Sequence, residues 1–262
     1  MQTIHVKPDN LDERNAEFPQ TPLDHPVFLN SLPKSGSHLL RNIIRMFVPV
    51  EHQYNADFIQ FANLKRHVAA FDGPPAKLSW GHLFFADISA ATTGGARRIL
   101  LVRDPYDWVL AMARFMLSDE FSGDLDILKK APLTAEELMN VVIFGLPRQS
   151  PGLHETFLFN AVAWLGTGEY LVRFEELREA VKNLDSDESE AYFARLLEAC
   201  GIAMPDDWRE RVRIGADPEQ SGTARRNLTM RGVTIPDTLP QAQRDIVDLV
   251  SPSLRTILGY AQ

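Results

Sequence analysis

The stretch VFLNSLPKSGSHLLR, residues 27–41, decides the fold. Its apolar first part, Val27 to Leu32, predicts a buried strand. From Ser37 to Phe47 the apolar side chains recur at three- and four-residue steps, which predicts an amphipathic helix. The turn Pro33 to Ser37 joins the two, so the segment reads as a strand that passes directly into a helix.

The rest of the chain repeats this alternation of strand and helix. Short apolar runs bounded by polar or turn residues predict further strands at Lys77–Trp80, Ile99–Val102 and Tyr170–Phe174. Helical spacing predicts helices at Pro105–Leu117, Thr134–Phe144, Glu155–Leu165, Glu188–Cys200 and Gln241–Leu258. The Arg-, Gly- and Pro-rich stretch Pro205–Pro236 is expected to be mostly loop. The pattern predicts an α/β fold with a central parallel sheet flanked by helices.

Length and composition limit the organisation and the partners. The 262 residues, 45% of them hydrophobic, suffice for one large core, and we expect a polar arm at residues 1–25 followed by a single domain at residues 26–262. The 27 Lys and Arg residues against 35 Asp and Glu residues give a net charge of −8, which disfavours nucleic acid as a partner.

Cysteine content and hydropathy bear on the cellular location. The single cysteine, Cys200, permits no internal disulfide, and the first residues lack the apolar core of a signal peptide. No apolar run reaches the roughly 18 residues that span a bilayer, so no transmembrane segment is expected. These features predict a cytoplasmic protein.

The turn after the first strand has the features of a phosphate-binding loop. Backbone N–H groups and a helix N-terminus converge there, Gly36 allows close approach of a ligand, and Lys34 adds a positive charge. Ser35 and Ser37 offer hydroxyl groups. The turn differs from the nucleotide loop GxxxxGK[ST], because Lys34 precedes its one glycine. The alternative is a well-capped turn without a ligand.

A second candidate anion site follows another predicted strand. The sequence RRILLVRDPYDW, residues 97–108, ends its apolar run at Arg103 and begins a helix at Pro105. Ligands of parallel sheets bind beyond the carboxyl ends of the strands, so Lys34 and Arg103 are expected to face one ligand with two anionic groups. An ion pair of Arg103 with Asp104 or Asp107 is the alternative.

Together these segments resemble the sulfotransferases that use 3′-phosphoadenosine 5′-phosphosulfate (PAPS). PKSGS at Pro33–Ser37 is similar to their 5′-phosphosulfate loop, and LVRDPYDWVLAMARF at Leu101–Phe115 is similar to their 3′-phosphate motif. YLVRFEEL at Tyr170–Leu177 is similar to their strand that ends in a YEDL-type sequence. The resemblance implies the P-loop-like sulfotransferase fold, transfer of a sulfuryl group from PAPS to a hydroxyl or amine, and the product adenosine 3′,5′-bisphosphate (PAP).

The resemblance also assigns donor-binding residues. It implies contacts to the donor from the loop and the two later motifs, at Lys34, Ser35, Gly36, Ser37, His38, Arg103 and Phe174. Arg225 and Arg226 are the expected equivalents of a late arginine-containing loop that binds the 3′-phosphate. The chain departs from the family at Ala111, where a serine is usual, at Leu39, where an aromatic residue is usual, and at Phe174, where tyrosine is common.

Seven histidines compete for the role of general base. His82 follows directly on a predicted strand and matches the family's KTH-type segment, with Trp80 and Gly81 in place of lysine and threonine. His38, inside the loop, is expected to contact phosphate. The catalytic residues are therefore predicted to be His82 as base and Lys34 as the group that stabilises the departing phosphate, with no metal.

The acceptor is predicted only by class, as a small or lipid-like molecule with a hydroxyl group. Candidates for its apolar pocket are Trp80, Phe84, Phe85, Phe58, Phe61 and the helix Leu138–Phe144, and the segment Ser118–Lys130 is a candidate lid. Two other functions remain open: a small-molecule kinase, and a catalytically silent nucleotide-binding scaffold of the same fold.

Overall fold

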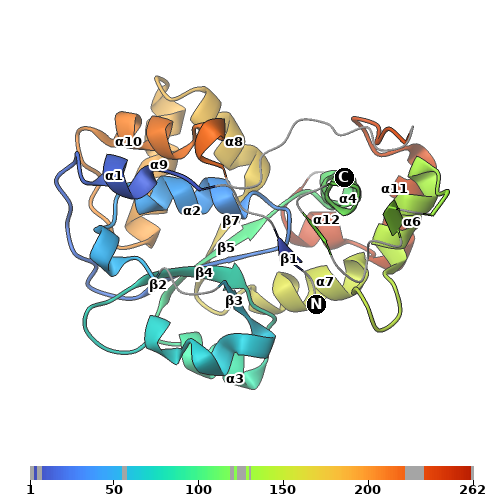
Figure 1. Ribbon diagram of the computed structural model, residues 1–262, viewed down its shortest axis with the longest axis horizontal. Coiled ribbons are helices and arrows are strands. Elements are labelled where there is room, and N and C mark those ends of the chain that lie inside the picture. The colour runs from blue at the N-terminus through green and yellow to red at the C-terminus, as the bar shows by residue number, and fades with distance from the viewer. Residues whose placement is uncertain are drawn as a thin grey trace.

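A five-stranded parallel sheet, in the order β3-β4-β2-β5-β7, forms the centre of the protein (Figure 1). The computed structural model describes residues 3–4, 8–54, 58–118, 121–122, 128–129, 131–221 and 233–260. The strands of this sheet are β2 (Val27–Ser31), β3 (Ile59–Gln60), β4 (Leu78–His82), β5 (Arg97–Val102) and β7 (Glu169–Arg173). Two short strands, β1 (Thr3–Ile4) and β6 (Phe121–Ser122), pair separately and antiparallel.

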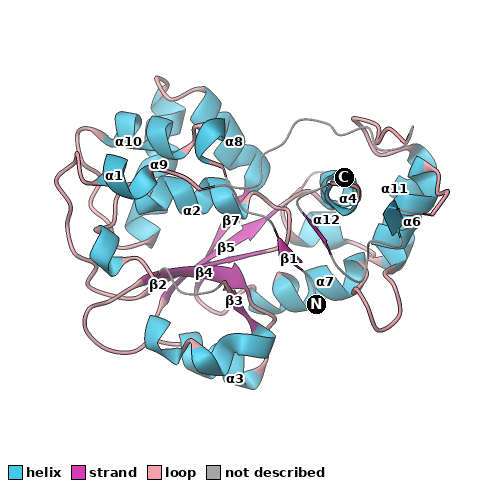
Figure 2. Cartoon of the chain, viewed as in Figure 1, coloured by secondary structure: helices cyan, strands magenta, loops and turns pink. Residues whose placement is uncertain are grey.

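Helices cover both faces of the sheet, as Figure 2 shows. They are α1 (Leu11–Asn15), α2 (Ser37–Arg45), α3 (Asp87–Thr93), α4 (Pro105–Met116), α6 (Ala135–Phe144), α7 (Leu153–Asn160), α8 (Phe174–Lys182), α9 (Asp187–Ala199), α10 (Trp208–Gly215), α11 (Gln241–Val250) and α12 (Leu254–Ile257). Short 3₁₀ turns lie at Val50–His52, Phe61–Arg66, Val68–Ala70, Val162–Trp164 and Pro218–Gln220.

The alternation of side chains along the strands divides the core into two clusters. In β5, Ile99 and Leu101 pack with α2, α8, α9 and α10, whereas Leu100 and Val102 pack with α4, α6, α7 and α11. Because apolar residues face both ways, the central strands read as continuous hydrophobic runs, as expected of a parallel sheet covered on both sides. The predicted α/β fold is confirmed.

The register brings the carboxyl ends of the central strands to one edge. Ser31 of β2 lies opposite Leu101 of β5, and Val102 lies opposite Arg173 of β7. On the other side of β2, Asn30 pairs with Gly81 of β4. The residues that follow these strands therefore share one edge of the sheet. The strand of each of the three sequence motifs ends at this edge.

Most predicted elements are present, with three corrections. The helix predicted for Glu155–Leu165 ends at Asn160 as α7 and is followed by a 3₁₀ turn at Val162–Trp164. The four predicted strands are found with shifts of at most two residues at either end. The loop prediction for Pro205–Pro236 is wrong in part, because it contains α10, whose inner face includes Arg211. The long helix predicted for Gln241–Leu258 is broken into α11 and α12 at Ser253, which has a φ of 61°.

The described part of the N-terminal arm packs on the domain. Leu11 of α1 is buried in the same cluster as α2, and Asn15 donates hydrogen bonds to the carbonyl oxygens of Arg45 and Val48. Arg45, buried at the end of α2, pairs with Asp9 and Asp12 of the arm. Within the described residues, no helix has the length and apolar character needed to span a membrane.

Arg211 fixes α10 to the arm and to α2, and its removal should destabilise the fold. Its guanidinium pairs with Asp207 and donates to the carbonyl oxygens of Pro19 and Met46, and the residue is 2% exposed. We expect Arg211→Ala to lower the free energy of unfolding by about 2–4 kcal/mol, because buried carbonyls lose their donors. Urea denaturation measures this change. Arg213→Ala, on the exposed face of α10, is the matched control and should change it by less than about 0.5 kcal/mol; equal effects would contradict the role of Arg211.

Candidate active site

The loop between β2 and α2 presents backbone amides at the sheet edge that have no acceptor among the described residues. Lys34 and Gly36 have φ angles of 59° and 95°, so the chain turns sharply into the helix. The amide of Leu40 is bonded to the carbonyl of Gly36. The amides of Ser37, His38 and Leu39, at the N-terminus of α2, precede this first helical bond and have no helical acceptor. They provide the donors that bind an anion at a helix N-terminus.

Packing against Phe174 explains why Gly36 is glycine. A Cβ at this position would overlap the ring of Phe174, and its φ of 95° disfavours other residues. Phe174 is the first residue of α8, directly after β7. The third motif therefore holds the loop of the first motif in shape.

Arg103 joins the second motif to the same loop. Its Nη1 donates to the backbone carbonyl of Lys34 at 3.2 Å, and its guanidinium lies 4.6 Å from the ring centroid of Phe174. Burial lowers its pKa, and its Nε is buried with no acceptor in the described part of the chain. The structure thus brings Lys34, Arg103, Gly36 and Phe174 together, and Arg103 retains hydrogen-bonding capacity for an anion.

The helix α4 supports the loop from the other side. Trp108 donates its indole N–H to the carbonyl of Pro33 at 2.7 Å, and Lys34 places its Nζ 4.3 Å from the ring centroid of Phe115. Ser35 is fully buried and donates its hydroxyl to the carbonyl of Leu32. The hydroxyl of Ser35 therefore shapes the loop, whereas that of Ser37 lies on the α2 side, next to Ser31.

His82, the last residue of β4, lies beside the end of β2. Its Nδ1 is 2.6 Å from the backbone oxygen of Ser31 and 3.1 Å from the Ser31 hydroxyl. An Nδ1–H that donates to a carbonyl fixes the neutral tautomer in which Nε2 carries a lone pair. That lone pair is what a general base needs.

Ser31 also connects His82 to the phosphate loop. Its hydroxyl lies 2.8 Å from the hydroxyl of Ser37. When Ser31 donates to Ser37, the proton of the Ser37 hydroxyl is left for a ligand. Sequence reasoning missed Ser31, and its only signal was its position at the end of the strand, three residues before Lys34.

Two histidines at this edge are held neutral. Burial, together with the charges of Lys34 and Arg41, lowers the pKa of His38 to about 4. Burial, together with His38 and Lys34, lowers the pKa of His82 to about 3, against the effect of its bond to Ser31. Burial is the main cause of both shifts, and the neighbouring positive charges of Lys34 and Arg41 add to the shift of His38.

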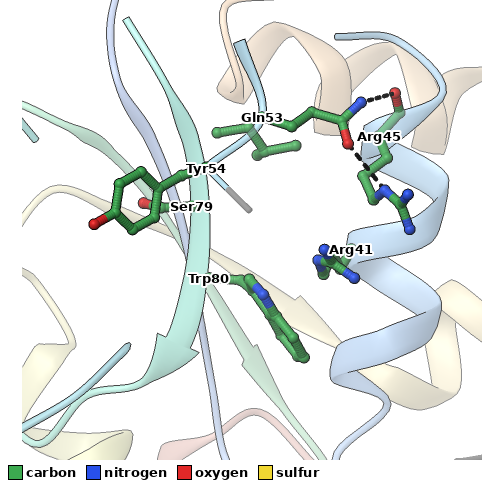
Figure 3. Close-up of a pocket in the computed structure, with 7 residues that line it drawn as sticks. Arg41, Arg45, Gln53, Tyr54, Ser79 and Trp80 are labelled. Atoms are coloured by element: carbon green, nitrogen blue, oxygen red, sulfur yellow. Dashed lines mark hydrogen bonds between the residues drawn. The ribbon is translucent and has the colours of Figure 1, made fainter. Parts of the chain in front are cut away.

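Two cavities are found in the described part of the structure, one between α2 and β4 and one at the start of α4. The smaller, of about 10 Å³, is lined by Arg41, Arg45 and Trp80 among others, as Figure 3 shows. The larger, of about 450 Å³, opens beyond the start of α4 and is lined by charged residues including Asp104, Arg244 and Arg255. Asp104 is paired there with Arg255, so the alternative ion pair of Arg103 with Asp104 is not formed.

The remaining predicted site residues are distributed unevenly. Arg225 and Arg226 lie outside the described residues, as do most of the residues of the candidate lid. Of the apolar acceptor candidates, the ring of Phe58 lies 4.5 Å from that of His82 and 4.8 Å from that of Trp80. Phe85 packs on Trp164 in the core, and Phe61 is exposed. Phe58 thus contacts both His82 and Trp80, whereas Phe84 packs against Phe159.

Comparison with known proteins identifies the fold. The structure is similar to that of mouse sulfotransferase SULT7A1 complexed with PAP, with a TM-score of 0.54 and 17% identity over 96% of this chain and 92% of that chain. The sulfotransferase domain from the curacin biosynthetic pathway aligns with a TM-score of 0.38 and 12% identity over 92% of this chain and 99% of that domain. No family model and no curated protein matches the sequence. The chain has the fold of the sulfotransferases, as its three motifs predict.

Substitution of Gly36 tests the packing of the loop. We expect Gly36→Ala to weaken PAP binding by about tenfold or more, since the methyl group would displace Phe174 and move the amides. Isothermal titration calorimetry measures the affinity. Gly95→Ala, at a position with no neighbouring atom within 4 Å, is the control and should bind PAP normally. Unchanged affinity in Gly36→Ala would show that the loop does not bind the nucleotide.

The neutral histidines predict how stability depends on pH. Below pH 6.5 the unfolded chain takes up protons at His38 and His82, whereas the folded chain takes them up only near pH 4 and 3. The free energy of unfolding should therefore fall between pH 7 and pH 5, by about 1–2 kcal/mol for each histidine. Chemical denaturation at both pH values measures the loss. His38→Gln should show a smaller loss than the unaltered chain; an equal loss would contradict the shift at His38.

Proposed function

We propose that this protein is a PAPS-dependent sulfotransferase that moves a sulfuryl group from PAPS to a hydroxyl group of a small or lipid-like acceptor. The observation that carries the proposal is the meeting of Lys34, Arg103 and the free amides of α2 at one sheet edge, with His82 beside them. The sulfotransferase fold supports it. The cytoplasmic location expected from the single cysteine is part of the same proposal.

The donor is proposed to lie along the carboxyl edge of the sheet. The amides of Ser37 and His38, the hydroxyl of Ser37 and the ammonium of Lys34 bind the 5′-phosphosulfate. Arg103 binds the 3′-phosphate, where its buried Nε finds an acceptor. Arg225 and Arg226 are proposed as further contacts to the 3′-phosphate, and Phe174 as part of the surface that holds the nucleoside.

The reaction is proposed to be an in-line displacement at sulfur. The acceptor oxygen forms a bond to sulfur while the bond from sulfur to the phosphate oxygen breaks, and the electron pair of that bond leaves with PAP. His82 takes the acceptor proton on Nε2, since its Nδ1 is bonded to Ser31. Lys34 and the loop amides stabilise the charge that develops on the departing phosphate.

The pKa of His82 also bears on its role as a base. A base with a pKa of about 3 is weak, and part of that lowering comes from the neighbouring positive charge of Lys34. The negative charge of a phosphosulfate at the loop opposes this smaller contribution, whereas burial is the main cause of the low pKa.

Binding and turnover of three variants test the proposal. We expect PAP to stabilise the protein against thermal unfolding without Mg²⁺, and Lys34→Ala to weaken PAP binding by about tenfold or more. His82→Ala should reduce turnover of a hydroxylated acceptor with radiolabelled PAPS by roughly 10²–10⁴-fold while leaving PAP affinity within about threefold. Lys182→Ala, on the exposed end of α8, is the control.

Other outcomes would select the other functions. Stabilisation by Mg²⁺-ATP and not by PAP would support a kinase. Tight PAP binding without turnover of any acceptor in a broad panel of alcohols, phenols and amines would support a silent scaffold. Full turnover in both Lys34→Ala and His82→Ala would eliminate the site.

A further inference from the structure

Arg41 is a cation near the site that the proposed reaction does not use. It lies on α2, one turn after His38, and its guanidinium carbon is 4.7 Å from the ring centroid of Trp80 on β4. Figure 3 shows the side chain extending from α2 toward β4, beside the indole of Trp80. Burial, and the charge of Arg45, lower the pKa of Arg41 to about 10.

Arg45, one turn further along α2, is an arginine whose charge and hydrogen-bond donors have partners. It pairs with Asp9 and Asp12 and donates to the side-chain oxygen of Gln53 at 2.9 Å. Within the described residues, by contrast, no carboxylate lies within 4 Å of the Arg41 guanidinium and no group accepts a hydrogen bond from it. The carboxylates of Asp9 and Asp12 act on Arg41 only from a distance, because both are paired with Arg45. A partly buried cation without a directly paired carboxylate is a candidate to bind an anionic ligand.

The position of Arg41 indicates whether such a ligand is the donor or the acceptor of the proposed reaction. Along the sheet edge, Phe174 and Arg103 follow β7 and β5, the loop follows β2, and His82 ends β4. Trp80 and His82 are two residues apart on β4, so their side chains share one face. The ring of Phe58 contacts both, and that of His38 lies 5.0 Å from Trp80. Arg41 is therefore on the acceptor side of His82, away from Arg103.

We propose that Arg41 binds an acidic group of the acceptor, which makes the substrate a hydroxylated carboxylate or a related anion. This inference rests on the proposed function. The apolar part of the acceptor lies against Trp80 and Phe58, and its hydroxyl reaches Nε2 of His82. The guanidinium donates two parallel hydrogen bonds to the carboxylate.

Matched acids and amides test the proposal. The probes are 4-hydroxybenzoate, 4-hydroxyphenylacetate and 3-(4-hydroxyphenyl)propionate, each compared with its neutral carboxamide by isothermal titration calorimetry, with and without saturating PAP. We expect the unaltered protein to bind at least one acid about tenfold or more tightly than its amide. Arg41→Gln should remove this preference, and Arg41→Lys should reduce it. Arg66→Gln, at an exposed arginine, should preserve it.

Three results would overturn the proposal. The first is equal affinity for acids and amides across the series in the unaltered protein. The second is an acid preference that survives Arg41→Gln. The third is a loss of PAP affinity in Arg41→Gln as large as the loss of acid affinity. The last would assign the charge to the donor. The titrations without PAP test acid binding by Arg41 even if PAP fails to bind. A failure of the sulfotransferase proposal can therefore be distinguished from a failure of the proposal for Arg41. Acid preference in the unaltered protein is informative whether or not the variants fold.

Discussion

The contact on which the site depends is the stacking of Phe174 on Gly36, with Arg103 on the same ring. It joins three segments that are far apart in the sequence, because the loop after β2, the end of β5 and the start of α8 meet only through the parallel register of the sheet. Arg103 then reaches the carbonyl of Lys34. The backbone shape that presents the amides of α2 is therefore a property of the whole edge and not of the loop alone.

Local sequence patterns predicted the sheet and the position of the loop because both follow from short-range rules. Apolar runs such as Ile99–Val102 form buried strands, and the turn at Gly36 requires a residue that tolerates a positive φ. The contact of Arg103 with the backbone of Lys34 agrees with one further rule, that parallel strands end at the same edge, and a shared ligand stays a prediction. No comparable rule predicts which residues bind the acceptor, so the sequence indicated only a set of apolar candidates for that pocket.

What the sequence could not predict depends on long-range partners of polar residues. Arg211 lies in the stretch that was expected to be mostly loop, yet it is buried on α10 and donates hydrogen bonds to the carbonyl oxygens of Pro19 and Met46. Ser31 lies in an apolar run, and only the register with β4 places its hydroxyl beside His82. Arg41 and Arg45 are alike in sequence, and only the packed arm shows that Arg45 has carboxylate partners.

The N-terminal arm is bound to α2 by ion pairs and hydrogen bonds. Asp9 and Asp12 neutralise Arg45, and Asn15 occupies the carbonyls at the end of α2. A chain that begins at residue 26 would retain every strand of the central sheet. It would leave Arg45 as a buried charge without its two carboxylate partners. The boundary at residue 25 that polarity suggests is thus crossed by contacts, since residues 9–15 bind to α2, the helix that follows the loop after β2.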